Sequence, residues 1–145
     1  MPVPAKTEVT FSKWLKHVLS IPFIWMPVVP GILLQVAATI YQATCFRLYG
    51  IERVKLMDYI YFDREKLGYL TLFDKINCAY CSYMNGSFAY ISEIGRRTEY
   101  YWCGVKHRNQ PDNPAFAYQA KFATYGSKED YESHLLSSGR RSLKK

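Results

Sequence analysis

The amino-acid sequence predicts a mainly α-helical protein with one N-terminal transmembrane or re-entrant helix. A small helical domain would follow, stapled by a metal ion and holding at most one short strand. Three observations support this class: a long uncharged apolar run, helical spacing of the apolar residues that follow it, and a C-x2-C…C-x3-H pattern. We divide the chain into an N-terminal tail (1–17), a hydrophobic membrane segment (18–49), a soluble Cys/His domain (50–136) and a basic tail (137–145).

The membrane segment is defined by the 29 residues from Val18 to Phe46, which include no Asp, Glu, Lys or Arg. About 20 apolar residues in a helix are enough to cross a bilayer. Prolines crowd the first half of the run and would kink a helix there. A single span is favoured over a re-entrant hairpin that bends at residues 27–31. Aromatic residues near its ends would anchor it at the membrane interface: Trp14, Trp25, Tyr41 and Tyr49.

The charges beside this segment bear on its orientation. Lys13 and Lys16 precede the run, whereas Arg47, Arg53 and Lys55 follow it. Because cytoplasmic flanks carry the excess of positive charge, the count leans slightly toward a cytoplasmic C-terminal side. We therefore expect a protein of the bacterial inner (cytoplasmic) membrane with its Cys/His domain in the cytoplasm. Basic residues on both flanks would also suit the re-entrant alternative.

Residues 50–145 are predicted as short elements in sequence order. Alternating aromatic and aliphatic residues indicate a short strand at 59–62. Asp63 would cap a helix over 64–76, and the two cysteines at 78 and 81 would lie in the turn after it. Residues 85–87 (Asn-Gly-Ser) indicate a break or the cap of the next helix, whose spacing continues from 87 to 107, and a loop follows at 108–114. Residues 116–125 suit helix or strand, and Ser127 would cap a final helix ending near residue 136.

The candidate metal site is Cys78, Cys81, Cys103 and His107, in which 21 residues separate the two pairs. A C-x2-C turn can offer two thiolates to one ion, and a Cys and a His four apart on a helix share a face. Zn²⁺ is the predicted cofactor; iron suits the set less well because a His would replace a thiolate. Four protein ligands would close the site, so its predicted role is structural.

Two alternatives to the metal site remain open. Cys78 and Cys81 could form a redox pair in a membrane-tethered thiol-disulfide oxidoreductase, although such motifs normally open a helix after a strand. The three cysteines could also be small buried thiols, with His107 a surface histidine. Glu99 could accept a hydrogen bond from His107 or pair with Arg96. For the carboxylates we favour ion pairs over a role at the metal, including one between Glu93 and Arg97.

Enzymatic activity is not supported by the sequence. It contains no glycine-rich phosphate loop, no serine nucleophile elbow and no H-E-x-x-H motif, and no small-molecule substrate is indicated. His17 and His134 are expected to be solvated. The net charge of +7 is spread along the chain, and only residues 140–145 form a basic cluster, so nucleic acid is not expected as a partner. The expected partners are membrane lipid and other membrane-protein subunits.

Several motifs together resemble a family of small uncharacterised bacterial membrane-associated proteins. They are the C-A-Y-C run at 78–81, the W-C-G-V-K-H run at 102–107, the C-F-R-L-Y-G-I run at 45–51 and the Tyr125-to-Tyr131 element. The likeness covers roughly residues 20 to 135. It implies a shared architecture and no particular activity. The 13 tyrosines exceed what a core of about 100 residues can bury. The predicted function is for this reason a membrane-anchored accessory or assembly subunit of a membrane protein complex, with the thiol oxidoreductase as the alternative.

Overall fold

The computed structural model describes residues 11–109 and 113–139, with side chains from Leu15 onward. Within these ranges the regular structure is helical, which confirms the mainly α class, and an isolated bridge joins Val105 to Ala123. The strand predicted at 59–62 is not formed there. The helices are α1 (Phe11–Trp25), α2 (Val28–Tyr41), the π-helix η1 (Gln42–Phe46), α3 (Arg47–Tyr49), α4 (Leu72–Trp102) and α5 (Lys128–Ser137). Three 3₁₀ segments complete them: η2 (Leu56–Asp58), η3 (Arg64–Lys66) and η4 (Pro114–Lys121).

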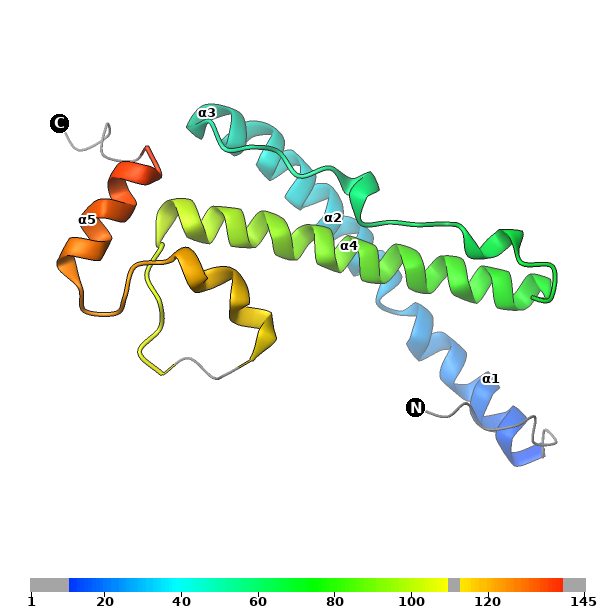
Figure 1. The fold of residues 1–145 in the computed structure, drawn as a ribbon. Coiled ribbons are helices and arrows are strands. Elements are labelled where there is room, and N and C mark those ends of the chain that lie inside the picture. Colours follow the sequence, from blue (N-terminus) through cyan, green and yellow to red (C-terminus); the bar gives the residue numbers. More distant parts are fainter. Residues whose placement is uncertain (1–10, 110–112, 140–145) are drawn as a thin grey trace.

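Helices α1, α2, η1 and α3 follow one another as one kinked rod (Figure 1). The rod contains Leu15–Tyr49, 35 residues that are long and apolar enough to cross a membrane, and we call this stretch the apolar rod. Pro22 and Pro27 lie at the kink between α1 and α2, where they interrupt the helical hydrogen bonding. The chain does not fold back at 27–31, and α1 and α2 continue in one general direction (Figure 1). The rod ends at Gly50, whose φ of 65° is the left-handed conformation that stops a helix.

Helix α4 is a single helix of 31 residues, where the sequence suggested two helices and a turn. It begins with a capping box: the Asp74 amide donates to the Thr71 hydroxyl, and the Thr71 amide donates to the Asp74 carboxylate, both with a donor–acceptor distance of 3.2 Å. The cap predicted at Asp63 opens only the short η3 turn. Residues 77–86 continue the helix, because cysteine, asparagine and glycine weaken a helix without stopping it when tertiary contacts hold it.

The apolar rod and α4 run in the same general direction and cross at an angle, and α1 diverges from α4 (Figure 1). Trp25 packs on Tyr80 near one end, with ring centroids 4.9 Å apart, and Tyr49 packs on Tyr101 near the other at 5.3 Å. Between them lies the core cluster of Phe46, Val54, Tyr90 and Ile94. This core is small, so the two helices are joined largely through the polar and aromatic side chains described below.

The segment that joins the rod to α4, residues 50–71, returns along both helices and is called here the connector. It is irregular apart from η2 and η3. Gly86 of α4 allows its close approach, since a Cβ there would meet the carbonyl oxygen of Tyr59 and lie 2.7 Å from Ile60 Cγ1. The glycine that suggested a helix break therefore marks a helix-to-connector contact.

The C-terminal part packs against the end of α4. The side chain of Ser127 caps α5 by accepting from the Asp130 amide at 3.2 Å, which confirms the predicted final helix. Residues 116–125, left open between helix and strand, include the end of the 3₁₀ segment η4. His134 was expected to be solvated, but it is buried against Gly104, Tyr100 and Phe122. Residues 1–10 and 140–145, within the predicted tails, lie outside the described residues.

Candidate functional site

The four predicted metal ligands do not meet in this structure. Cys78 and Cys81 lie within α4, whereas Cys103 caps its far end. A helix rises about 1.5 Å per residue, so the 22 positions from Cys81 to Cys103 correspond to about 33 Å. Zinc ligands must all lie about 2.0–2.3 Å from one ion. No group of three or more His, Cys, Asp or Glu side chains among residues 15–109 and 113–139 could hold a metal ion.

The metal-stapled domain is therefore not supported, and the reason is the continuity of α4. The C-x2-C and C-x3-H pairs could converge only if the chain reversed between them, as the predicted turn would allow. Cys81 and Cys103 are exposed, Cys78 is half-buried and His107 is exposed. Zinc binding stays a prediction, and one ion could not use all four residues of one chain while α4 remains intact.

The alternative redox pair also lies in the helix interior. Cys78 and Cys81 are three residues apart, close to one face of α4 and about two turns after its start. The positive end of a helix dipole, which activates thiols in thioredoxin-like motifs, acts mainly within the first turn. Cys78 and Cys81 therefore lack the helix-terminal position that normally makes such a pair reactive.

Glu99 has partners other than those considered from the sequence. It accepts hydrogen bonds from the Tyr118 hydroxyl at 2.7 Å and from Gln119 Nε2 at 2.9 Å. Burial, and after it the hydrogen bond to Glu99, raises the pKa of Tyr118 above its ordinary value. Glu99 thus ties η4 to α4. Glu93 pairs with Arg97 at 2.9 Å, as the i,i+4 spacing predicted.

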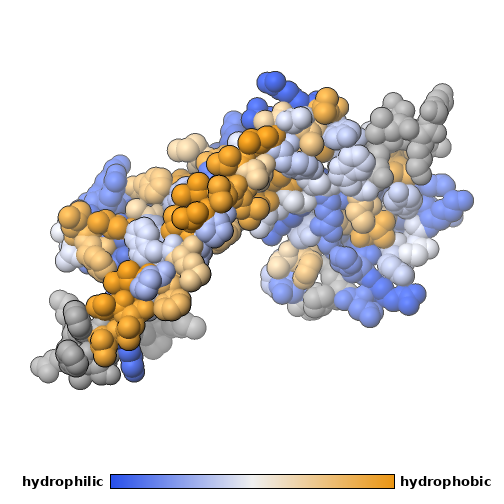
Figure 2. All heavy atoms as spheres, turned by 180° about the vertical axis from the view of Figure 1, so that it is seen from behind, coloured by the Kyte–Doolittle hydropathy of each residue, from blue (hydrophilic) through white to orange (hydrophobic). Residues whose placement is uncertain are grey.

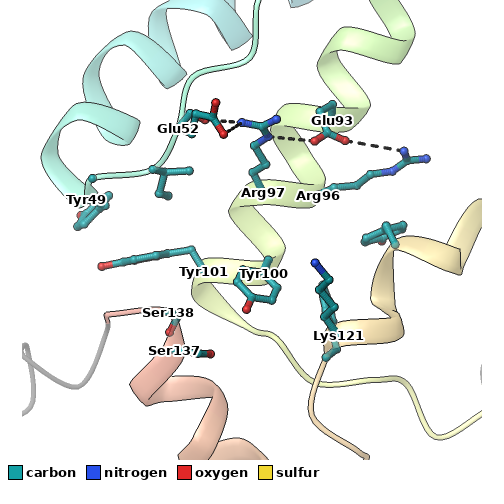
Figure 3. A pocket seen from close by; sticks show the side chains of 14 residues that line it. Tyr49, Glu52, Glu93, Arg96, Arg97, Tyr100, Tyr101, Lys121, Ser137 and Ser138 are labelled. Carbon is teal, nitrogen blue, oxygen red and sulfur yellow. Dashed lines mark hydrogen bonds and ion pairs between the residues drawn. The ribbon is translucent and has the colours of Figure 1, made fainter.

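A cavity of about 570 Å³ opens beside these residues, between the end of the rod, α4, η4 and α5 (Figure 3). Its cations are Arg96, Arg97 and Lys121, and its carboxylates are Glu52 and Glu93. Arg97 Nη1 donates to the Glu52 carbonyl at 2.8 Å, so this pair ties the connector to α4. Four tyrosines also line the cavity: Tyr49, Tyr100, Tyr101 and Tyr118.

The charges of this cavity largely cancel. Glu93 accepts from Arg97 and also lies 3.9 Å from Arg96, and the Arg96 guanidinium stacks over the Tyr118 ring at 4.9 Å. Lys121 extends from η4 into the same space (Figure 3). Three cations against two carboxylates leave a small positive excess, which does not define a strong anion site.

A polar ladder joins the rod to α4 and is the feature that sequence reasoning missed. Gln35 Oε1 accepts from the Tyr83 hydroxyl at 2.6 Å and from the Ser87 hydroxyl at 2.8 Å. Further along, Thr39 shares a hydrogen bond with the Tyr90 hydroxyl at 3.1 Å. Gln42 is 2 % exposed and donates to the same Tyr90 hydroxyl. Polar side chains in an apolar helix serve to join it to a neighbouring helix, and that signal was present in the sequence.

The four predicted membrane anchors have different surroundings. Trp25 is 41 % exposed yet contacts Tyr80, and Tyr41 hydrogen-bonds Thr98 at 3.2 Å. Tyr49 is half-buried between Tyr101 and Trp102. The side chain of Trp14 lies outside the described residues. Each of the three described aromatic residues therefore packs on α4.

Comparison with known proteins supplies no relative for this chain. No family model matches it, and neither a curated protein nor a solved structure is significantly similar to it. The resemblance to small bacterial membrane-associated proteins therefore stays a prediction.

Proposed function

We propose that the protein is a membrane-anchored accessory subunit, in which the apolar rod holds the chain at a membrane and the remaining surface binds another protein. The observation that carries the proposal is the exposure of the rod: only 6 % of its most apolar 18-residue window is buried within the protein. Soluble monomers rarely leave such a large contiguous apolar surface in water. A lipid environment would cover it.

A second apolar surface supports the binding of a partner. Large side chains remain exposed around the start of α4 and the adjoining connector, and we call them the tip cluster: Tyr61, Phe62, Tyr69, Leu72, Phe73 and Ile76. Tyr69 is 80 % exposed and Leu72 is 76 % exposed. Aromatic and aliphatic residues gathered on a surface are typical of protein interfaces. This cluster is separate from the rod in sequence and suits a contact with another subunit.

Blue-native electrophoresis of native membranes, with the chain expressed at its natural level, tests the proposal. We expect the protein to migrate in a complex larger than its own mass, and the Leu72→Ser/Phe73→Ser double variant to release it. Leu136→Ser is the matched control, since Leu136 is 57 % exposed on α5 and far from the cluster in sequence. Migration as a free monomer would refute the accessory role, and recovery in the soluble fraction would refute membrane attachment.

A further inference from the structure

Helix α4 covers one side of the apolar rod along most of its length. The contact begins at Trp25, where the Tyr80 hydroxyl donates to the carbonyl oxygen of Ile24, and it ends at Tyr49, which packs on Tyr101. The helical residues before the contact, Phe11 to Ile24, extend only about 21 Å at 1.5 Å per residue. The hydrocarbon core of a bilayer is about 30 Å thick. A crossing would therefore take part of α4 into the bilayer.

The connector would enter with it. Ser82 of α4, two residues after Tyr80, donates to the carbonyl oxygen of Tyr61, and Arg64 lies beside Cys78. The connector is mostly irregular, and its exposed Asp63 and Arg64 lie in this stretch. Irregular backbone facing lipid leaves hydrogen-bonding groups without partners, and charged groups at that depth cost several kcal/mol each. An upright rod is therefore unfavourable, because lipid would surround α4 and the connector as well as the rod.

The two sides of α2 differ in a way that suits a membrane surface. Gly31, Gln35 and Ala38, with Gln42 of η1 just beyond, follow one stripe toward α4 and are buried or half-buried. The opposite stripe is apolar and exposed: Val29 66 %, Leu33 65 %, Val36 49 % and Ile40 62 %. Seen from the back, hydrophobic atoms form a nearly continuous ridge along the rod, with hydrophilic atoms beside it (Figure 2). Helices with one apolar side lie in the interface plane.

The charge at the rod ends agrees with this arrangement. Lys16 and Arg47 are exposed near the two ends, and residues 9–51 include no Asp or Glu. Cations at both ends favour contact of both ends with the same anionic leaflet, since each is worth about 1 kcal/mol near such a surface. An upright rod would place them on opposite sides of the membrane.

We propose that the apolar rod lies along the surface of an anionic bilayer, with the Val29–Ile40 stripe immersed and with α4 and the connector on the water side. This inference rests on the membrane attachment proposed above and specifies its geometry. The ligand is the lipid surface itself, bound through the ridge and through the cations at the two rod ends.

Depth measurements on the full chain test the geometry. A genetically encoded fluorescent amino acid is placed at Val29 or Ile40, and the protein is bound to phosphatidylcholine–phosphatidylglycerol vesicles containing lipids brominated at known depths. Positions on the lipid-facing stripe should be quenched at equal, shallow depth, about 5–10 Å below the headgroups. An upright rod would separate the two by about 16 Å. Such a separation, or no quenching at either position, would overturn the proposal.

Labelling from either side of the membrane gives an independent result in cells. His17→Cys and Leu48→Cys variants, made in a chain whose four native cysteines are replaced by serine, are treated with an impermeant maleimide in spheroplasts and in inside-out vesicles. Both should react from the same side, and reaction from opposite sides would overturn the in-plane rod while leaving the accessory role intact. If both positions react from the same side but the wild-type protein migrates as a free monomer in blue-native electrophoresis, only the accessory role is refuted. A fully soluble protein would refute both.

Discussion

Gln42 is the residue whose replacement tests the packing of the rod most directly. Its side chain is 2 % exposed and makes both hydrogen bonds to the connector backbone at Val54: Nε2 donates to the carbonyl at 3.1 Å, and Oε1 accepts from the amide at 3.0 Å. Nε2 also donates to the Tyr90 hydroxyl. One amide side chain therefore joins the rod, the connector and α4.

The Gln42→Leu variant keeps the approximate volume and removes these hydrogen bonds. It leaves the Val54 amide and carbonyl without their buried partner, whereas the Tyr90 hydroxyl keeps its hydrogen bond with Thr39. Each unsatisfied buried group costs about 1–3 kcal/mol, so two groups at the lower value predict a loss of about 2 kcal/mol. Because 1.4 kcal/mol is a factor of ten, the hydrogen of the Val54 amide should exchange about 30-fold faster if its exchange requires the opening that this loss makes easier.

Native-state hydrogen exchange in detergent micelles measures this change residue by residue. The control is Gln35→Leu, because Gln35 is bonded to Tyr83 and Ser87 of α4 and does not contact the connector backbone through a hydrogen bond. That variant should weaken the contact between α2 and α4 and leave the exchange of the Val54 amide nearly unchanged. Wild-type exchange at Val54 in Gln42→Leu would refute the assigned hydrogen bonds.

Gly86→Ala should destabilise the protein by about 1–3 kcal/mol in a denaturant titration, because the new methyl group meets the connector backbone. Gly95→Ala, with nothing within 4 Å, should instead stabilise it by up to about 1 kcal/mol; equal effects would contradict the close approach. Cys103→Ser should leave the zinc content per chain unchanged in elemental analysis, because α4 separates this thiol from the C-x2-C pair. Loss of stoichiometric zinc would show that α4 is interrupted. The unfolding free energy should fall as pH rises above about 10, since the raised pKa of Tyr118 means that the folded state holds this proton longer than the unfolded state. A Tyr118→Phe variant should show a shallower fall, and an unchanged slope would contradict the burial of that hydroxyl.

Several features could be predicted because their causes are local. The run from Val18 to Phe46 contains no charged residue, and this composition alone makes the helix apolar over a length that can cross a membrane. The Glu93–Arg97 pair follows from helical spacing, and Ser127 caps α5 through its own side chain. Each of these depends on residues within a few positions of one another, so composition and spacing are sufficient to find them.

The errors arose where local signals were weak. The N-G-S run at 85–87 is typical of a break, yet Gly86 continues α4 because the connector packs on it. Because the helix is continuous, Cys81 and Cys103 are separated by about 33 Å, and they cannot bind the same metal ion. The capping box of Thr71 and Asp74 was visible in the sequence and marks the true start. The cap predicted at Asp63 was a competing signal of the same kind.

The sequence by itself determined the helical class, the apolar rod and the pair of thiols three residues apart, because these depend on side-chain chemistry and spacing alone. Only the tertiary structure decided that α4 is one helix, that it runs beside the rod, and that Gln35, Thr39 and Gln42 face it. The physical reason is that the i, i+4, i+7 spacing of these three residues marks a polar stripe but does not identify its partner, because Gln35 meets Ser87 and Thr39 meets Tyr90 about 50 positions away. Those contacts cover the polar side of an apolar helix and leave its other side exposed.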